Sequence, residues 1–217
     1  MSASGKSTST SDKPRTGRKR GRGADTKKTK RDLTSAAFDS LREDGFRGST
    51  ARAIATRAGC NQAAIYYHFG GIEELWLHAL NESSRSRLTR YEERFAEHHD
   101  LAPLVAALDE LYAEDLASGH LDVLSELMGG VTANPDIADG IAEATEPWLH
   151  FVEEQVRAAS QHHPWGKFVP AADAADLIFS LVLGMQIRSR VDGRTDRAER
   201  LFRLAGLGAS IADRSTS

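Results

Sequence analysis

Four consecutive residues, Asn61-Gln62-Ala63-Ala64, form the part of the sequence whose side chains are best suited to contact base pairs. A glutamine amide donates and accepts hydrogen bonds at the same time, which matches the edge that adenine presents in the major groove of DNA. Alanine methyl groups can pack against the methyl group of thymine. The stretch therefore predicts a short helix whose first residues enter a groove about 12 Å wide.

The elements that must position this stretch are three short helices joined by tight turns. Gly45 and Gly59 are expected to end the first two helices, because glycine is the usual residue after a helix. Thr50 and Asn61 are suitable N-cap residues for the second and third. The apolar positions repeat every three or four residues and face one core: Leu33, Ala37, Leu41, Ile54, Ala58, Ile65 and Phe69. Residues 26–72 are therefore predicted to form a helix-turn-helix unit.

Four segments of this region carry a resemblance to a known family. They are Gly45-Phe46-Arg47-Gly48-Ser49-Thr50-Ala51-Arg52-Ala53-Ile54-Ala55, Ala58-Gly59-Cys60, Ile65-Tyr66-Tyr67-His68-Phe69 and Glu73-Glu74-Leu75. On these residues the chain resembles the tetracycline-repressor-like (TetR/AcrR) family of transcription regulators. Beyond residue 80 the chain resembles the family only in the general arrangement of its helices. It implies a homodimer that binds an inverted-repeat operator in double-stranded DNA.

The resemblance also implies which side chains contact DNA. Thr50 matches a position that contacts a phosphate, and Arg52 one that meets a guanine or a phosphate. Tyr66, Tyr67 and His68 match positions that contact the DNA backbone. Packing roles for the tyrosines and a capping role for the histidine are the alternatives, but two adjacent helix residues cannot both face one core. The expected DNA-binding set is Thr50, Arg52, Asn61, Gln62, Ala63, Ala64, Tyr66, Tyr67 and His68.

Charge is distributed in three blocks along the chain. Residues 1–31 carry 11 Lys and Arg residues against two Asp residues, whereas residues 32–72 carry four basic and four acidic residues. Residues 73–217 carry 13 basic and 25 acidic residues. This asymmetry indicates an anionic partner at the N-terminal end.

Residues 1–25 have almost no apolar side chains and are predicted to be a disordered basic arm. Family members commonly carry Lys where this chain has Ile72, and that Lys contacts a phosphate. A DNA-binding arm would compensate, since arginines and lysines interleaved with glycine can lie in a narrow minor groove. The alternative is a solubilising leader. The expected contact residues of the arm are Arg15, Arg18, Lys19, Arg20 and Arg22.

The remaining chain, residues 73–217, is predicted to be a helical effector-binding and dimerisation domain. Turn residues separate helices expected at about 72–98, 101–117, 121–133, 136–160, 171–191 and 196–212. Residues 174–187 are apolar around nearly the whole circumference, so two sides of that helix must be covered. The resemblance attributes this to a four-helix bundle with a second subunit; a larger monomeric core is the alternative. The fold class is therefore all-α, with about nine helices.

The family's effector pocket lies among the middle helices. The candidate lining residues are large apolar or aromatic side chains, which favour a small apolar or aromatic effector. They are Trp76, Tyr112, Met128, Trp148, Phe151, Phe179 and Met185. Each of them is also compatible with an ordinary core position.

Several classes of protein are not expected. The single Cys60 excludes a disulfide scaffold and a multi-cysteine zinc site, and no metal or cofactor is expected. No catalytic motif is present, so the chain is not expected to be an enzyme. It has no apolar stretch of membrane-spanning length and no leader, which favours the cytoplasm. The expected function is a repressor released from DNA by an effector; the alternative is an effector-independent or architectural DNA-binding dimer.

Overall fold

The computed structural model describes residues 18–96, 101–161, 166–194 and 196–214. Within these residues the chain forms nine α-helices and two short 3₁₀ helices and has no strand, which confirms the predicted all-α fold. The elements are α1 (Arg18–Gly48), α2 (Ala51–Arg57), α3 (Ala63–Phe69), α4 (Ile72–Phe95), α5 (Leu101–Ser118), α6 (His120–Gly130), η1 (Pro135–Ile137), α7 (Ala138–Gln161), η2 (Gly166–Phe168), α8 (Ala171–Asp192) and α9 (Asp196–Arg214).

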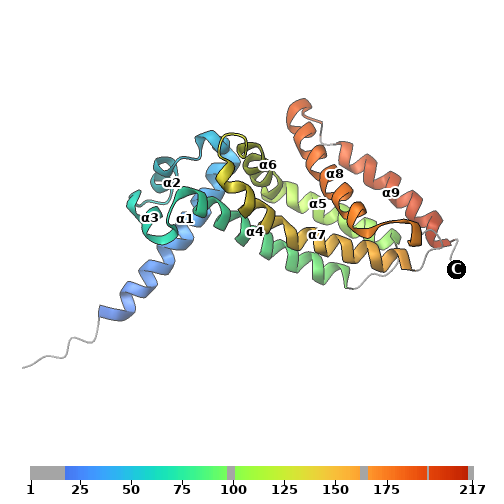
Figure 1. Cartoon of the computed structure of the whole chain (residues 1–217), viewed down its shortest axis with the longest axis horizontal. Coiled ribbons are helices and arrows are strands. Elements are labelled where there is room, and N and C mark those ends of the chain that lie inside the picture. Colours follow the sequence, from blue (N-terminus) through green and yellow to red (C-terminus); the bar gives the residue numbers. More distant parts are fainter. Residues whose placement is uncertain (1–17, 97–100, 162–165, 195, 215–217) are drawn as a thin grey trace, which may run out of the picture.

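The first helix begins earlier than predicted. α1 starts at Arg18, so residues 18–25, which were expected to belong to a disordered arm, are helical. Extending an existing helix avoids the cost of nucleation, and Lys and Arg are good helix formers. The first turns of α1 project away from the rest of the molecule (Figure 1). Of the expected contact residues of the arm, Arg18, Lys19, Arg20 and Arg22 lie on this helix, and Arg15 lies outside the described residues.

The end of α1 is marked by Gly45, as predicted. Its φ of 71° and ψ of 178° interrupt the helix, which continues for one more turn to Gly48. Such a positive φ is readily adopted only by glycine. The turn brings Phe46 against the ring of Trp76 on α4, with 5.0 Å between ring centroids. Trp76 Nε1 donates a hydrogen bond of 2.9 Å to Ser49 Oγ. These contacts fix the helix-turn-helix unit, α1–α3, on the first half of α4.

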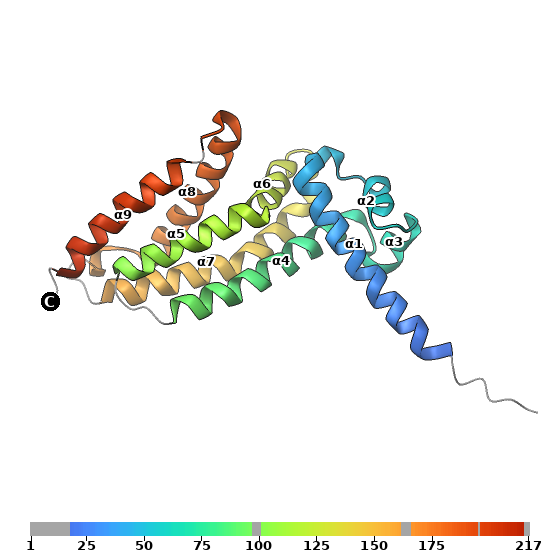
Figure 2. The same cartoon turned by 180° about the vertical axis from the view of Figure 1, so that it is seen from behind.

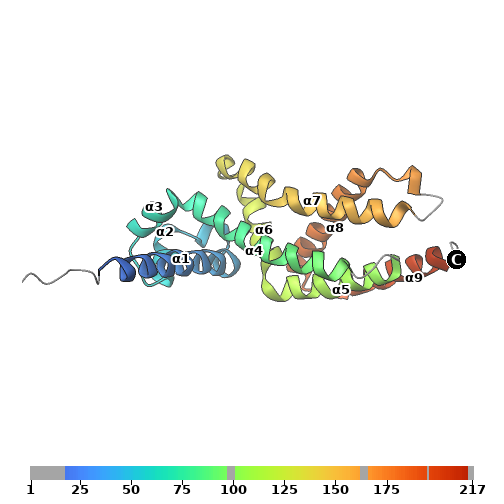
Figure 3. The same cartoon turned by 90° about the horizontal axis from the view of Figure 1, so that it is seen from below.

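The C-terminal half extends from this unit along the long axis of the molecule. α4, α5 and α7 run along this axis, α8 packs on α7, and α9 lies along α5 (Figures 1 and 2). Figure 3 shows the helix-turn-helix unit at one end and the C-terminus at the other. Asp213, near the end of α9, accepts hydrogen bonds from the backbone N–H groups of Leu101 and Ala102 at 3.2 and 3.0 Å and so caps α5. None of the described helices is both long enough and apolar enough to cross a membrane.

Candidate functional site

The second helix of the helix-turn-helix unit is capped by Thr50. Its Oγ1 accepts a hydrogen bond of 3.2 Å from the backbone N–H of Ala53. A hydroxyl that accepts in this way still carries a proton that it can donate to a phosphate oxygen. Ile54 and Ala55 anchor the helix in the core, whereas Arg52 is exposed beside the cap. The helix therefore holds an exposed guanidinium next to a free hydroxyl donor.

Adjacent residues at the start of the third helix have different roles. Asn61 Oδ1 accepts a hydrogen bond of 3.1 Å from the backbone N–H of Ala64, so this amide caps the helix. Ala64 is half-buried and packs against the core. Gln62 and Ala63 are exposed. Of the four residues predicted to meet base edges, the structure leaves these two free of structural roles.

Two aromatic side chains stand out from the same helix. Tyr66 and Tyr67 are 58% and 80% exposed, so neither is a core residue. His68 is half-buried and contacts the edge of the Tyr67 ring at 4.8 Å between centroids. A polar, exposed aromatic pair next to a short capped helix is suited to contacts with sugars and phosphates.

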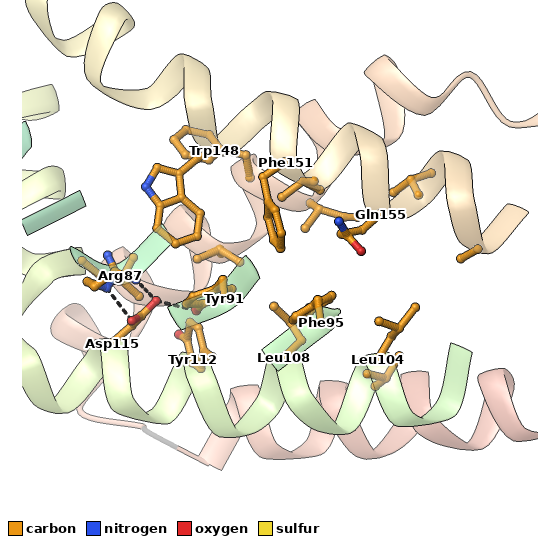
Figure 4. Close-up of a pocket in the computed structure, with 18 of the residues that line it drawn as sticks. Arg87, Tyr91, Phe95, Leu104, Leu108, Tyr112, Asp115, Trp148, Phe151 and Gln155 are labelled. Atoms are coloured by element: carbon orange, nitrogen blue, oxygen red, sulfur yellow. Dashed lines mark hydrogen bonds and ion pairs between the residues drawn. The ribbon is translucent and has the colours of Figure 1, made fainter. Parts of the chain in front are cut away.

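A cavity of about 200 Å³ lies between α4, α5, α7 and α8 (Figure 4). Its walls are almost entirely apolar, which suits a small organic ligand. Four residues predicted as pocket liners line this cavity: Tyr112, Trp148, Phe151 and Phe179. A second opening of about 480 Å³ between α4 and α7 shares Phe95, Phe151 and Gln155 with it and is rimmed by the more polar Glu92, His150 and Glu154. The two hollows therefore share part of their walls, and the second is the more polar of the two.

Three of the residues predicted to line the effector pocket do not line this cavity. Trp76 belongs to the core beneath the helix-turn-helix unit, because its N–H is directed to Ser49. Met128 is 39% exposed on α6. Met185 is buried in a separate cluster beside Leu121. Their apolar character reflects packing or a surface position, so they are removed from the candidate site.

One end of the cavity carries a buried ion pair. Arg87 Nε donates to Asp115 Oδ1 at 2.5 Å, Arg87 Nη2 contacts Oδ2, and the Tyr91 hydroxyl donates to Oδ2 at 2.6 Å. Burial lowers the pKa of Arg87 to about 10 and raises the pKa of Tyr91 to about 12. At neutral pH Arg87 therefore keeps its positive charge and Tyr91 keeps its hydroxyl proton, and both donate to the Asp115 side chain.

A buried histidine lies beside this pair. His120 Nδ1 is 2.9 Å from Ser83 Oγ, and only 3% of the residue is exposed. Burial, together with the charge of Arg87, lowers the pKa of His120 well below its usual value. The ring is therefore neutral at pH 7 and contributes no charge to the cavity.

An apolar face on α8 and α9 is left uncovered in the single chain. Its exposed members are Leu177, Leu181, Ile187, Val191, Leu201, Leu204, Leu207 and Ile211. Gly184 and Gly208 lie on these helices, and a Cβ built on either glycine meets no atom of another described element within 4 Å. A group of exposed apolar side chains of this kind is typical of a protein interface.

Comparison with known proteins identifies the chain. Residues 33–79 match the family model described as bacterial regulatory proteins of the tetR family. This part of the chain is therefore a TetR-family DNA-binding domain. The chain is a DNA-binding transcription regulator with a helix-turn-helix. The regulator UidR of Escherichia coli K12 is 23% identical over 157 residues, which cover 72% of this chain and 79% of that protein.

Solved structures share the TetR-family fold. The fatty acid degradation regulator FadR of Bacillus halodurans superposes with a TM-score of 0.69 at 16% identity, covering 82% of this chain and 93% of that chain. A transcriptional regulator of Saccharomonospora viridis in complex with choline gives 0.68 at 19% identity, covering 82% and 94%. A TetR-family regulator of Rhodococcus sp. gives 0.69 at 17% identity, covering 83% and 98%.

Sequence reasoning missed the polar end of the cavity. Arg87 and Asp115 lie among many charged residues of α4 and α5, most of which are exposed. A signal was present in α4, because Ser84, Arg87 and Tyr91 continue the spacing of the buried stripe that includes Leu80. An arginine at a core-facing position of a helix needs a buried counter-ion.

Proposed function

We propose that this TetR-family regulator is a homodimeric repressor released from an inverted-repeat operator when a small molecule fills the cavity. The observation that carries the proposal is the double role of α4. Its first half packs in the core of the helix-turn-helix unit through Leu75, Ala79 and Leu80. Its second half lines the cavity through Arg87, Tyr91 and Phe95. A ligand that favours one setting of α4 changes the position of the DNA-binding helices by differential binding.

The exposed side chains of the helix-turn-helix unit support the DNA-binding part of the proposal. Gln62 and Ala63 contact base edges in the major groove, while Arg52, Tyr66 and Tyr67 contact the backbone or a neighbouring base. Thr50 donates a hydrogen bond to a phosphate, and His68 contacts the DNA backbone. Asn61 caps the third helix, and Ala64 packs against the core. The basic residues of positions 15–22 add phosphate or minor-groove contacts that strengthen binding without reading sequence.

The uncovered face of α8 and α9 supports a second copy of this chain as the dimerisation partner. A twofold dimer presents two helix-turn-helix units to two half-sites, which matches an inverted repeat. Gly184 and Gly208 allow the backbones of the two copies to approach closely. Residues 26–72 then act as the DNA-binding domain and residues 73–217 as the domain for dimerisation and effector binding.

The apolar cavity favours ligand gating over an effector-independent architectural role, because a domain that only dimerises has no need for such a chamber. A small molecule bound to a protein of this fold, choline in the Saccharomonospora viridis regulator, gives further support. The protein acts in the cytoplasm, where the DNA is, and the proposal assigns it no bond-making chemistry.

Selection of binding sites from random DNA, followed by footprinting, tests the proposal. We expect an inverted repeat with half-site centres roughly 34–36 Å apart, or a related spacing if two dimers share the site. A single asymmetric, unrepeated site contradicts it. Gating is tested with Leu108→Trp, which fills the cavity from α5. We expect this variant to bind the operator as the parent does and to ignore effectors that release the parent protein.

A further inference from the structure

Gln155 is the only polar residue, among those that the structure describes, that lines both the cavity and the second hollow. Its side chain leaves α7 on the side that faces α5, so the amide points into the cavity (Figure 4). The residue is half-buried, and its amide forms no hydrogen bond with any other described residue. The amide is also open to a water-sized molecule, unlike the indole nitrogen of Trp148, which is sealed. An unpartnered donor and an unpartnered acceptor therefore stand together in a wall that is otherwise almost entirely apolar.

The polar side chains at the opposite end of the cavity already have partners. Arg87 and Tyr91 lie at that end, away from Gln155 (Figure 4), and both donate hydrogen bonds to Asp115. A ligand group that took Arg87 from Asp115 would leave a buried carboxylate without its counter-ion. This end therefore receives the apolar part of a ligand, and the polar part is recognised at Gln155.

The carboxylates that line the second hollow lie in water. Glu92 and Glu154 are exposed, and Glu154 Oε1 lies 3.3 Å from His150 Nε2. A ligand carboxylate at Gln155 would meet these two negative charges and no Lys or Arg among the described residues that line the hollow. A ligand cation would lose its hydration for only weak attraction, because exposed carboxylates are screened by water. The site therefore favours a polar group without charge.

We infer that the effector is an uncharged amphiphile whose apolar body fills the cavity and whose carboxamide group pairs with the amide of Gln155. A carboxamide donates and accepts along one edge, as a glutamine amide does, so two hydrogen bonds can form side by side. The inference rests on the proposed function, since it names the chemical class of the gating ligand. The apolar body lies along Phe95, Leu108 and Phe151 and ends near Trp148.

Four para-pentylphenyl compounds with end groups of similar shape separate the ligand classes. Their end groups are a carboxamide, an isopropyl group, a carboxylate (an anion) and an amidinium (a cation). We expect calorimetry to show that the carboxamide binds the full-length protein roughly tenfold or more tightly than either ion. Equal or tighter binding of an ion overturns the exclusion of charge. Absence of binding by the carboxamide overturns the inference as a whole.

The role of Gln155 is tested by removing its amide while keeping the length of the side chain. In Gln155→Met the affinity for the carboxamide should fall roughly tenfold or more, because the donor and the acceptor of the ligand both lose their partners. The affinity for the isopropyl compound should not fall, since that compound makes no hydrogen bond. An equal fall for both compounds would mean that Gln155 acts only through packing, and an unchanged affinity for the carboxamide would mean that another group binds it. Either result overturns the assignment to Gln155.

Two further variants make the test specific. Gln161→Met makes the same change at an exposed residue of α7 that lines neither hollow, so it should leave carboxamide binding unchanged. A fall as large as that in Gln155→Met would show that the effect is not local and overturns the assignment. Gln155→Glu places a carboxylate where the amide was, so the preference should shift from the carboxamide to the amidinium through a charge-assisted hydrogen bond. An unchanged preference would show that the end group of the ligand does not lie at Gln155.

Failure of the inference can be told apart from failure of the proposed function. Binding of the probes is measured without DNA, whereas gating is measured as the change in operator affinity when a bound probe is added. Tight binding of the carboxamide with no change in operator affinity supports the ligand class and contradicts gating by that class. Release of the operator by a charged compound that binds in the cavity supports gating and overturns the ligand class.

Discussion

The backbone N–H of Phe46 donates a hydrogen bond of 3.0 Å to Oε2 of Glu126 and so ties the end of α1 to α6. Phe46 directly follows the break at Gly45, and a Cβ at Gly45 would lie 3.0 Å from the same carboxylate oxygen. The other oxygen, Oε1, accepts a hydrogen bond of 2.8 Å from Arg190 on α8. One carboxylate therefore connects the helix-turn-helix unit to the helix proposed to form the dimer interface.

Glu126→Leu is expected to lower the free energy of unfolding by about 1–3 kcal/mol, because the part-buried N–H of Phe46 loses its acceptor. Glu126→Gln is the control. Its amide oxygen can still accept from Phe46, and only the ion pair with the 40% exposed Arg190 is lost, at most about 1 kcal/mol. Urea denaturation of both variants measures the difference. Equal losses would mean that the hydrogen bond to Phe46 contributes nothing.

Removal of one member of the buried Arg87–Asp115 ion pair is expected to lower the stability of the protein more strongly. Asp115→Leu leaves Arg87 buried without a counter-ion, so we expect a loss of about 3–5 kcal/mol of stability. The double variant Arg87→Met with Asp115→Leu should be more stable than Asp115→Leu alone, because it removes the unpaired charge. It should not recover fully, since the Tyr91 hydroxyl still lacks its acceptor. A double variant less stable than the single one contradicts this account.

The neutral His120 predicts a dependence of stability on pH. Its folded pKa is lowered and its unfolded pKa is about 6.5, so the unfolded chain binds more protons below that pH. Stability is therefore complete above pH 6.5 and falls as the pH drops further, with a slope of at most about 1.4 kcal/mol per pH unit from this group.

Denaturation midpoints at several pH values between 7.5 and 5.5 test this dependence (a range chosen to bracket the ordinary histidine pKa, about 6.5). His120→Asn should flatten the slope, because its amide can replace Nδ1 toward Ser83 and does not titrate. His78 also has a lowered pKa, mainly because of burial, so part of the slope should remain in the variant. A variant as sensitive to acid as the parent would refute the role of His120.

Periodicity and capping residues were enough to predict the helices of this chain. The breaks at Gly45 and the cap at Thr50 follow from local backbone chemistry, and they occur where the sequence predicted them. The start of α1 was missed, because a basic composition says little about whether an existing helix continues.

The cavity was predicted only in part, because its lining depends on contacts between helices. Tyr112 and Trp148 line it, whereas Met185, an equally apolar residue on α8, is buried in another cluster. The spacing of α4 places Arg87 on its buried face, but nothing local in the sequence identifies Asp115 on α5 as its partner. Composition and periodicity do not predict which side chains of different helices will pair.

Two adjacent residues at the start of α3 should give opposite results when they are changed. Gln62→Ala removes an exposed amide with no structural role, so we expect operator affinity to fall by about 1–3 kcal/mol and preference at one base position to relax. Asn61→Ala removes the helix cap and should mainly lower stability, by about 1 kcal/mol. Operator binding and thermal denaturation of both variants measure the two effects. A loss of base preference with Asn61→Ala but not with Gln62→Ala would reverse the assignment.

Lys30 on α1 brings a positive charge to the end of α3. Its Nζ is 5.3 Å from the centroid of the Phe69 ring, at the end of α3, and its side chain is exposed. Ile72 is half-buried against the core, which explains why an apolar residue is tolerated there. Lys28, two residues earlier on α1, is instead paired with Asp32 at 2.7 Å.

We therefore expect Lys30→Met and Lys28→Met to differ in DNA binding, although both remove one positive charge from α1. Methionine keeps an apolar stem, so the packing of Lys30 on Phe69 is largely preserved. If Lys30 contacts a phosphate in each half-site, Lys30→Met should flatten the slope of log affinity against log salt by about 2 per dimer, at ~0.9 per contact. Lys28→Met should leave the slope nearly unchanged, because its charge is already neutralised by Asp32. Base preference should be the same in both variants, since Gln62 is intact. Identical slopes for the two variants would show that only net charge matters and that Lys30 makes no specific phosphate contact.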